Sequence, residues 1–126
     1  FDKEGRSIFK DNAVEGLLGG SAEAKPDVAK AASPVTYVSA DDPPFIHFHG
    51  TQDLRVAYRH AELIHGALEK AGVSSLLVPI TGGGHGSVSH PGVRERVDLF
   101  MARHLLGREN VISTEPLIAP EEKKQP

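Results

Sequence analysis

Apolar and polar positions form their clearest pattern between residues 43 and 107. The run FIHFH at residues 45–49 is bounded by two prolines and a glycine, which predicts a short buried strand. A second buried strand is predicted at Ser75–Ile80, before a threonine and three glycines. Pro79 lacks a backbone donor, so we expect it at an edge of the sheet or near the end of this strand.

Two helices are predicted to follow these strands. Residues Val56–Ala71 carry apolar side chains at helical spacing, and Gly72 stands where a helix commonly ends. The second helix is expected over Pro91–Leu106 and ends at Gly107; one of its faces carries Val93, Val97, Phe100, Met101 and Leu105. The order strand, helix, strand, helix predicts an α/β fold with parallel strands and a right-handed crossover. Because parallel sheets rarely have only two strands, we expect the C-terminal part of a larger α/β domain, its last βαβα unit.

The segments on either side carry weaker signals. Asn12 is expected to cap a short helix through Glu15–Leu18, and Pro26 to begin another that ends by Ala32. Residues Val35–Val38 are briefly β-like, and residues 119–126 are polar and flanked by proline, as in a solvated tail.

Composition narrows the class of protein. The 126 residues carry a net charge of −3 and 25% charged residues, which argues against a basic nucleic-acid-binding domain and against disorder of the whole chain. There is no apolar run of membrane-spanning length, so no membrane is expected as a partner. For the reason of charge given above, no nucleic acid is expected either. The absence of cysteine excludes thiol catalysis and zinc–thiolate sites but leaves the cellular compartment open. No cofactor is expected.

Candidate chemistry lies in the two segments that follow the predicted strands. Asp53 comes shortly after the first strand, and His85 lies among glycines after the second. The carboxyl ends of neighbouring parallel strands meet at one edge of a sheet, about 4.8 Å apart. We therefore expect Asp53 to accept a hydrogen bond from the His85 ring, as an acid–base pair requires. The alternative is that two ordinary loop residues flank a flexible glycine turn.

Three runs in this chain resemble one group of α/β-hydrolases. They are ASPVTYVSADDPPFIHFHGTQD, AELIHGALEKAGV and GGGHG, at residues 32–53, 61–73 and 82–86. In this order they resemble the C-terminal portion of esterases and lipases allied to acetylxylan and feruloyl esterases and to prolyl oligopeptidase-like hydrolases; the resemblance covers about residues 13–106.

The resemblance implies a serine hydrolase that acts on carboxylic esters, with acyl groups carried by carbohydrate as one substrate class. Asp53 would be the acid and His85 the base of a Ser–Asp–His triad. Residues 1–42 would then be a cap-like segment, residues 43–107 the βαβα part of the hydrolase domain, and residues 108–126 a tail. Esterases of this group are often exported, although the sequence itself fixes no location.

The nucleophile of this family is missing from the chain. No serine has glycine both two residues before and two residues after it, as the G-x-S-x-G elbow requires, and no His-Gly-Gly oxyanion motif is present. The expected partners are thus a small ester substrate and an N-terminal portion of the same protein, or another copy, that brings the serine. The isolated chain is expected to be inactive. The alternatives are a prolyl oligopeptidase-like peptidase and an inactive fragment that self-associates.

The other histidines receive structural interpretations. His47 and His49 alternate on one strand face, a pattern that metal sites use, but no metal site is predicted. The match of His49 to the His-Gly of the resembled family implies a hydrogen-bonded structural role for it, whereas His47 stands where that family usually has an aliphatic residue. His60 and His65 are expected at the surface of the first long helix. His90 is expected beside the mouth of the site.

Overall fold

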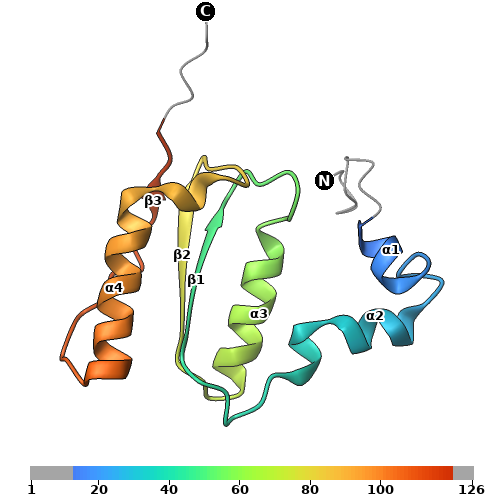
Figure 1. Ribbon diagram of the computed structural model, residues 1–126, viewed down its shortest axis with the longest axis horizontal. Helices are drawn as coiled ribbons and strands as arrows, with labels where there is room; N and C mark the ends of the chain where they lie inside the picture. The colour runs from blue at the N-terminus through green and yellow to red at the C-terminus, as the bar shows by residue number, and fades with distance from the viewer. Residues whose placement is uncertain (1–12, 121–126) are drawn as a thin grey trace, which may run out of the picture.

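The computed structural model describes residues 13–120 (Figure 1). The helices and strands follow in this order: α1 (Ala13–Leu18), α2 (Pro26–Ala32), the 3-10 helix η1 (Pro34–Tyr37), β1 (Phe45–Gly50), α3 (Arg59–Lys70), β2 (Ser75–Thr81), the 3-10 helix η2 (Ser87–Ser89), α4 (Pro91–Leu106) and β3 (Leu117–Ile118). The predicted helix cap Asn12 lies outside the described residues.

The sheet has three parallel strands in the order β1-β2-β3. The pairing of β1 with β2 runs from Phe45 opposite Ser75 to Gly50 opposite Ile80. Helices α3 and α4 lie on opposite sides of the strands (Figure 1). The α/β class and the parallel direction predicted from the order of the elements are therefore confirmed.

The face of the sheet toward α4 holds the apolar core. Val78 and Ile80 of β2 are fully buried and pack with Leu117 of β3. Ile46, Phe48, Val93 and Ala119 close around this cluster. Helix α4 has the predicted bounds, begins with a proline and ends at Gly107, whose φ of 63° suits glycine. Of its predicted apolar face, Phe100 is buried, whereas Met101 and Leu105 are exposed.

Strand β3 was not predicted. Its two residues lie in the segment assigned to the tail, and no periodicity marks so short a strand. Leu117 is buried because Gly92, at the start of α4, leaves room for its side chain: a Cβ on this glycine would lie 2.7 Å from Leu117 Cδ2. Arg96 of α4 also donates to the Glu115 carbonyl, which fixes the approach to the strand. Part of the expected tail is thus packed on the sheet.

Pro79 lies in the central strand, two residues before its last residue, Thr81. The bonds from Phe45 N–H to Ser74 O and from Thr51 N–H to Ile80 O show that the backbone N–H and C=O groups of even-numbered residues in β2 point toward β1. The backbone nitrogen of Pro79 therefore points away from β1, toward the side of β3. Pairing with β3 begins only at Ile80, so the donor that proline lacks is not needed there. The prediction of a position near the strand end is confirmed.

Helix α3 begins at Arg59, not at Val56 as the apolar spacing predicted. The Val56 N–H donates to the Asp53 carboxylate and the Val56 carbonyl accepts from His49, so this residue belongs to the loop. The helix ends as predicted. Gly72, with φ 84°, and the following valine donate to Glu69 O and Leu68 O.

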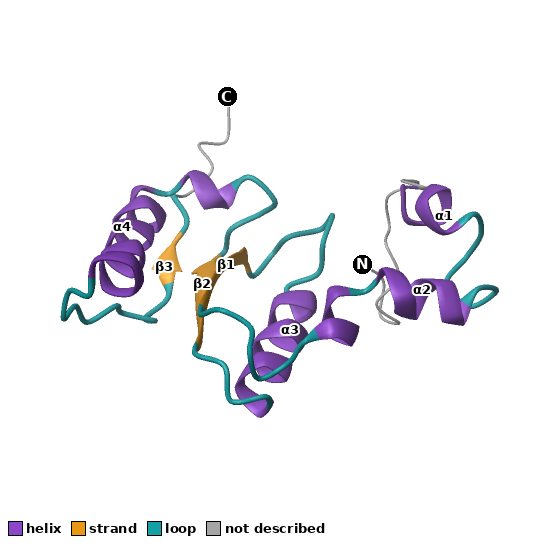
Figure 2. Ribbon diagram, turned by 60° about the horizontal axis from the view of Figure 1, so that its bottom comes forward, coloured by secondary structure: helices purple, strands orange, loops and turns teal. Residues whose placement is uncertain are grey.

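Between residue 13 and β1, the regular elements are helices, and the described residues there form no strand. Both short helices predicted there are present, but Val35–Val38 is not β-like, because η1 covers most of it. Thr36 and Tyr37 instead donate their hydroxyls to Lys30 O and Ala31 O, at the end of α2. Helices α1 and α2 lie beyond α3, away from the strands (Figures 1 and 2). Within residues 13–120, no helix combines the length and apolar character needed to cross a membrane.

Gly50, the last residue of β1, is buried where the two loops above the sheet approach each other most closely. A Cβ at this position would overlap the Gly83 carbonyl and lie 2.6 Å from Gly84 O. We expect Gly50→Ala to lower the free energy of unfolding by about 1–3 kcal/mol or more, because backbone must move to admit the methyl group. Urea denaturation measures this change.

Gly66→Ala is the matched control for this substitution. Gly66 lies within α3 and nothing surrounds its Cβ position within 4 Å. Alanine should therefore stabilise the helix by about 0.5–1 kcal/mol. Equal effects of the two substitutions would contradict the close approach at Gly50.

Candidate active site

The loops that follow β1 and β2 are joined by backbone hydrogen bonds. Thr51 N–H donates to Ile80 O at 3.0 Å, and Gln52 N–H donates to Gly83 O at 2.9 Å. The Thr51 hydroxyl oxygen accepts from Gly82 N–H at 3.0 Å. Gly82 has a φ of 75°, a conformation that favours glycine and turns the second loop back toward the first. The two loops therefore form one rigid rim at the carboxyl ends of the strands.

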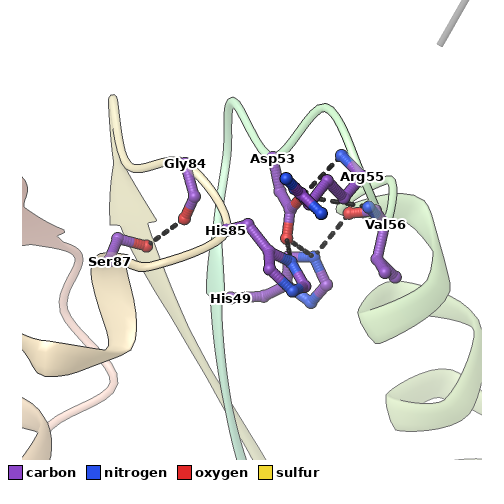
Figure 3. A network of polar contacts seen from close by, with 7 residues as sticks. All are labelled: His49, Asp53, Arg55, Val56, Gly84, His85 and Ser87. Carbon is purple, nitrogen blue, oxygen red and sulfur yellow. Dashed lines mark hydrogen bonds and ion pairs between the residues drawn. The ribbon is translucent and has the colours of Figure 1, made fainter. Parts of the chain in front are cut away.

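Asp53 lies in this rim with its side chain only 5% exposed (Figure 3). Its Oδ1 accepts from the Arg55 and Val56 backbone N–H groups at 2.8 and 2.9 Å. Its Oδ2 lies 3.0 Å from Nδ1 of His85. The structure thus brings together the two residues that the sequence placed at the ends of neighbouring strands.

The environment keeps the Asp53 carboxyl charged. Burial raises the pKa of Asp53, but the hydrogen bonds from the Val56 N–H, from His85 and from a second backbone N–H together hold that pKa below its ordinary value. A carboxylate only accepts hydrogen bonds, so the facing Nδ1 of His85 carries the proton. The Nε2 atom of His85 is then the basic nitrogen.

His85 is accessible, with 57% of its side chain exposed. Among residues 13–120, its ring contacts Asp53 alone through hydrogen bonds. Ser87, two residues further on, donates its hydroxyl to Gly84 O at 2.7 Å and not to the ring (Figure 3). No serine hydroxyl of the described part of the chain is hydrogen-bonded to His85. The basic Nε2 therefore remains available to a group outside this segment.

A third side chain, His49, faces the same carboxylate. Its Nε2 lies 2.8 Å from Val56 O and 3.4 Å from Asp53 Oδ2. The family resemblance implied a hydrogen-bonded structural role for His49 but not its position beside the acid. Neither its match to the family's His-Gly nor its alternation with His47 on one strand face favours a particular partner.

A shallow hollow of about 360 Å³ opens at this site. That volume lies at the lower end of the roughly 300–1,000 Å³ typical of small-molecule sites. Its walls combine the polar groups with apolar side chains, from Phe48, His49, Gly50, Asp53, Val56, His85 and Val88. His90 is not among them, contrary to the prediction: its ring instead caps α4 by accepting from Gly92 N–H. No residue of 13–42 lines the hollow, so the cap role of that segment stays a prediction.

His47 and His65 form a separate cluster between the sheet and α3. Both rings approach the buried Ser75 hydroxyl, at 3.2 Å from His47 Nε2 and 2.8 Å from His65 Nδ1. His65 also faces Glu69, at 3.5 Å. The prediction that His65 is a surface residue is wrong, because the turn of α3 above Ser75 directs its ring to the strand. His60 is exposed, as predicted.

No group of three or more histidine or acidic side chains within the described range is placed to hold a metal ion. His47 and His49 share a strand face, but each is engaged by a different set of protein atoms.

The fold and the Asp–His pair above parallel strands define the α/β-hydrolase type of protein. The BD-FAE family model matches residues 1–68, more than half of the chain. The chain therefore belongs to the BD-FAE family of α/β-hydrolase-like esterases.

Solved structures of esterases are similar to this chain. Native esterase 2 from Thermogutta terrifontis is 30% identical, with a TM-score of 0.59 over 79% of this chain and 37% of that one. The same esterase phosphonylated by sarin is 34% identical, with a TM-score of 0.56 over 59% and 30%. A truncated carbohydrate esterase from gut microbiota is 26% identical, with a TM-score of 0.60 over 65% and 30%. The chain thus spans about a third of the length of these relatives. Among curated protein sequences, none matches it.

The charge on Asp53 makes the free energy of unfolding depend on pH in the acidic range. Because its folded-state pKa lies below the unfolded value of about 3.9, its stabilisation is present above that pH and is lost as pH falls through the folded pKa. Asp53→Asn should lower the free energy of unfolding at neutral pH by about 1–3 kcal/mol and reduce this acid dependence. Denaturation curves between neutral and acidic pH measure both effects, with Asp98→Asn, an exposed carboxylate on α4, as control. Identical curves for the two variants would contradict the network.

His47 gives a second pH dependence, at higher pH. Burial lowers the pKa of His47, and the neighbouring His65 lowers it further. The unfolded chain takes up a proton on this ring near pH 6.5, whereas the folded chain does so only at lower pH, so stability falls as pH drops below about 6.5. His47→Leu should weaken the decline in stability between about pH 7 and 5. The exposed His104→Leu is the control, and an unchanged slope in His47→Leu would refute this assignment.

Proposed function

We propose that this chain supplies the acid and base of a Ser–Asp–His triad in a hydrolase of carboxylic esters. The observation that carries the proposal is the 3.0 Å contact between His85 Nδ1 and Asp53 Oδ2, with Nε2 left available. This pairing fixes the tautomer in which Nε2 takes a proton. Membership of an esterase family supports the same reaction.

The reaction follows from the positions of the two side chains. His85 Nε2 takes the proton from a serine hydroxyl as the serine oxygen bonds to the ester carbonyl carbon. Asp53 stabilises the imidazolium that results, and the same proton passes to the alcohol oxygen as the ester C–O bond breaks. Water, activated by the same nitrogen, then releases the acid from the serine.

The nucleophile in this proposal lies outside the 126 residues. The chain has no G-x-S-x-G sequence, and no described serine reaches His85. Within residues 13–120, β1 pairs only with β2 and leaves its other edge open. We place the partner segment, from the same protein or a second copy, at this edge, where strand addition is favourable.

The walls of the hollow support a small acyl substrate. Phe48, Val56 and Val88 present apolar surface beside His85. Thermogutta terrifontis esterase 2 was solved with propionate and with butyrate bound, and another similar structure is a carbohydrate esterase. We propose short-chain carboxylic esters as substrates, with carbohydrate as one class of alcohol.

A chimera tests the proposal. The chain replaces the portion of Thermogutta terrifontis esterase 2 with which it superposes, and hydrolysis of short-chain nitrophenyl esters is measured. We expect esterase activity that Asp53→Asn lowers by about 10⁴-fold and His85→Gln by at least as much. His104→Gln, an exposed substitution on α4, should leave the rate unchanged.

The chain alone provides the complementary measurement. A fluorophosphonate serine probe should add no mass to the 13.5 kDa chain and one adduct to the active chimera. Full activity of the Asp53→Asn chimera, or a probe adduct on the isolated chain, would overturn the proposal. Faster cleavage of peptide amides than of esters would favour the peptidase alternative.

A further inference from the structure

His49 is the one polar side chain of the hollow to which the proposed reaction gives no part. It lies at the end of β1, and its side chain is only 17% exposed. Its ring makes an edge contact with Tyr58, with the ring centres 5.9 Å apart. A histidine held on one side by an aromatic ring and on the other by the acid loop has a defined orientation.

The partner of Nε2 fixes the protonation of this ring. The Val56 carbonyl, 2.8 Å away, only accepts hydrogen bonds, so Nε2 of His49 carries a proton and donates it. The same Nε2 lies 3.4 Å from Asp53 Oδ2, too far for a full hydrogen bond but close enough for attraction between the N–H and the carboxylate. Two imidazole rings, of His85 and His49, therefore face Oδ2 (Figure 3).

Val56 connects His49 to the acid a second time. Its N–H donates to Asp53 Oδ1 at 2.9 Å, while its carbonyl accepts from His49. His49 thus binds the residue whose N–H donates to Oδ1, and its Nε2 also faces Oδ2. Loss of the ring would remove the N–H that faces Oδ2 and the side-chain contact that holds the Val56 carbonyl.

We propose that His49 is a positioning residue: it holds the Asp53 carboxylate in the orientation that keeps the proton of His85 on Nδ1. This inference rests on the proposed function only for its catalytic consequence. The geometric part concerns three side chains of this chain and is measurable without a nucleophile.

The test is the tautomer of His85 in the ¹⁵N-labelled full chain, read from ring ¹⁵N shifts at about pH 8, where histidine is ordinarily neutral. In the wild-type chain, His85 should be mainly the Nδ1–H form and His49 the Nε2–H form. His49→Leu should lower the ratio of Nδ1–H to Nε2–H in His85 by roughly fivefold. His49→Gln, whose amide N–H can replace Nε2–H, should restore most of this ratio.

His47→Leu is the matched control, since it removes a histidine from the same strand and face that has no contact with Asp53. It should leave the His85 tautomer unchanged, whereas a general loosening of the strand would alter it. A folded His49→Leu chain with the wild-type tautomer ratio would overturn the proposal. So would an Nδ1–H tautomer of His49 in the wild-type chain, a result that needs no variant to fold.

These outcomes are separate from those of the proposed function. An inactive chimera with the expected tautomers would reject the esterase assignment and keep the positioning role. An active chimera in which His49→Leu has wild-type kcat and a wild-type tautomer ratio would keep the esterase assignment and reject the positioning role of His49. If both stand, His49→Leu should lower kcat in the chimera with little change in KM, because ester binding does not depend on the proton of His85.

Discussion

The close approach of two backbones above the sheet is the constraint on which the site depends. Gly50 lies against the carbonyls of Gly83 and Gly84, at a distance that no side chain on residue 50 would allow. Hydrogen bonds from the next residues of the first loop to Ile80 and Gly83 keep the loops together. Asp53 and His85, 32 positions apart in the sequence, meet because their loops are joined at this point.

The acid is held by backbone more than by side chains. Two N–H groups of the 53–56 turn fix one carboxylate oxygen, so the negative charge stays in a buried position. The base is held loosely by comparison: one hydrogen bond orients it, and more than half of its side chain is exposed. This difference suits a pair in which the acid stays fixed and the base exchanges protons with a group supplied from elsewhere.

Local pattern was reliable where a residue's neighbours in sequence decide its structure. The bounds of α4 follow from Pro91 and Gly107, and the end of α3 follows from Gly72, because chain stereochemistry acts within a few residues. The pattern failed where distant atoms compete. Val56 has helical spacing, but its hydrogen bonds to Asp53 and His49 keep it in the loop. Leu117 forms a strand only because β2 pairs with it and Gly92 leaves room for its side chain.

The sequence by itself determined the α/β class and the parallel strands, and it predicted that Asp53 lies near His85, since the alternation of strands and helices brings the two strand ends to one edge. It also showed that the chain lacks a G-x-S-x-G nucleophile. Only the tertiary structure decided which histidine serves which partner. Seven histidines have the same chemistry, and their partners, Asp53 and Val56 for His49, Ser75 for His47 and His65, and Gly92 for His90, are set by packing across strands and helices. Hydrogen bonds act over about 3 Å, so such assignments need positions that no sequence spacing provides.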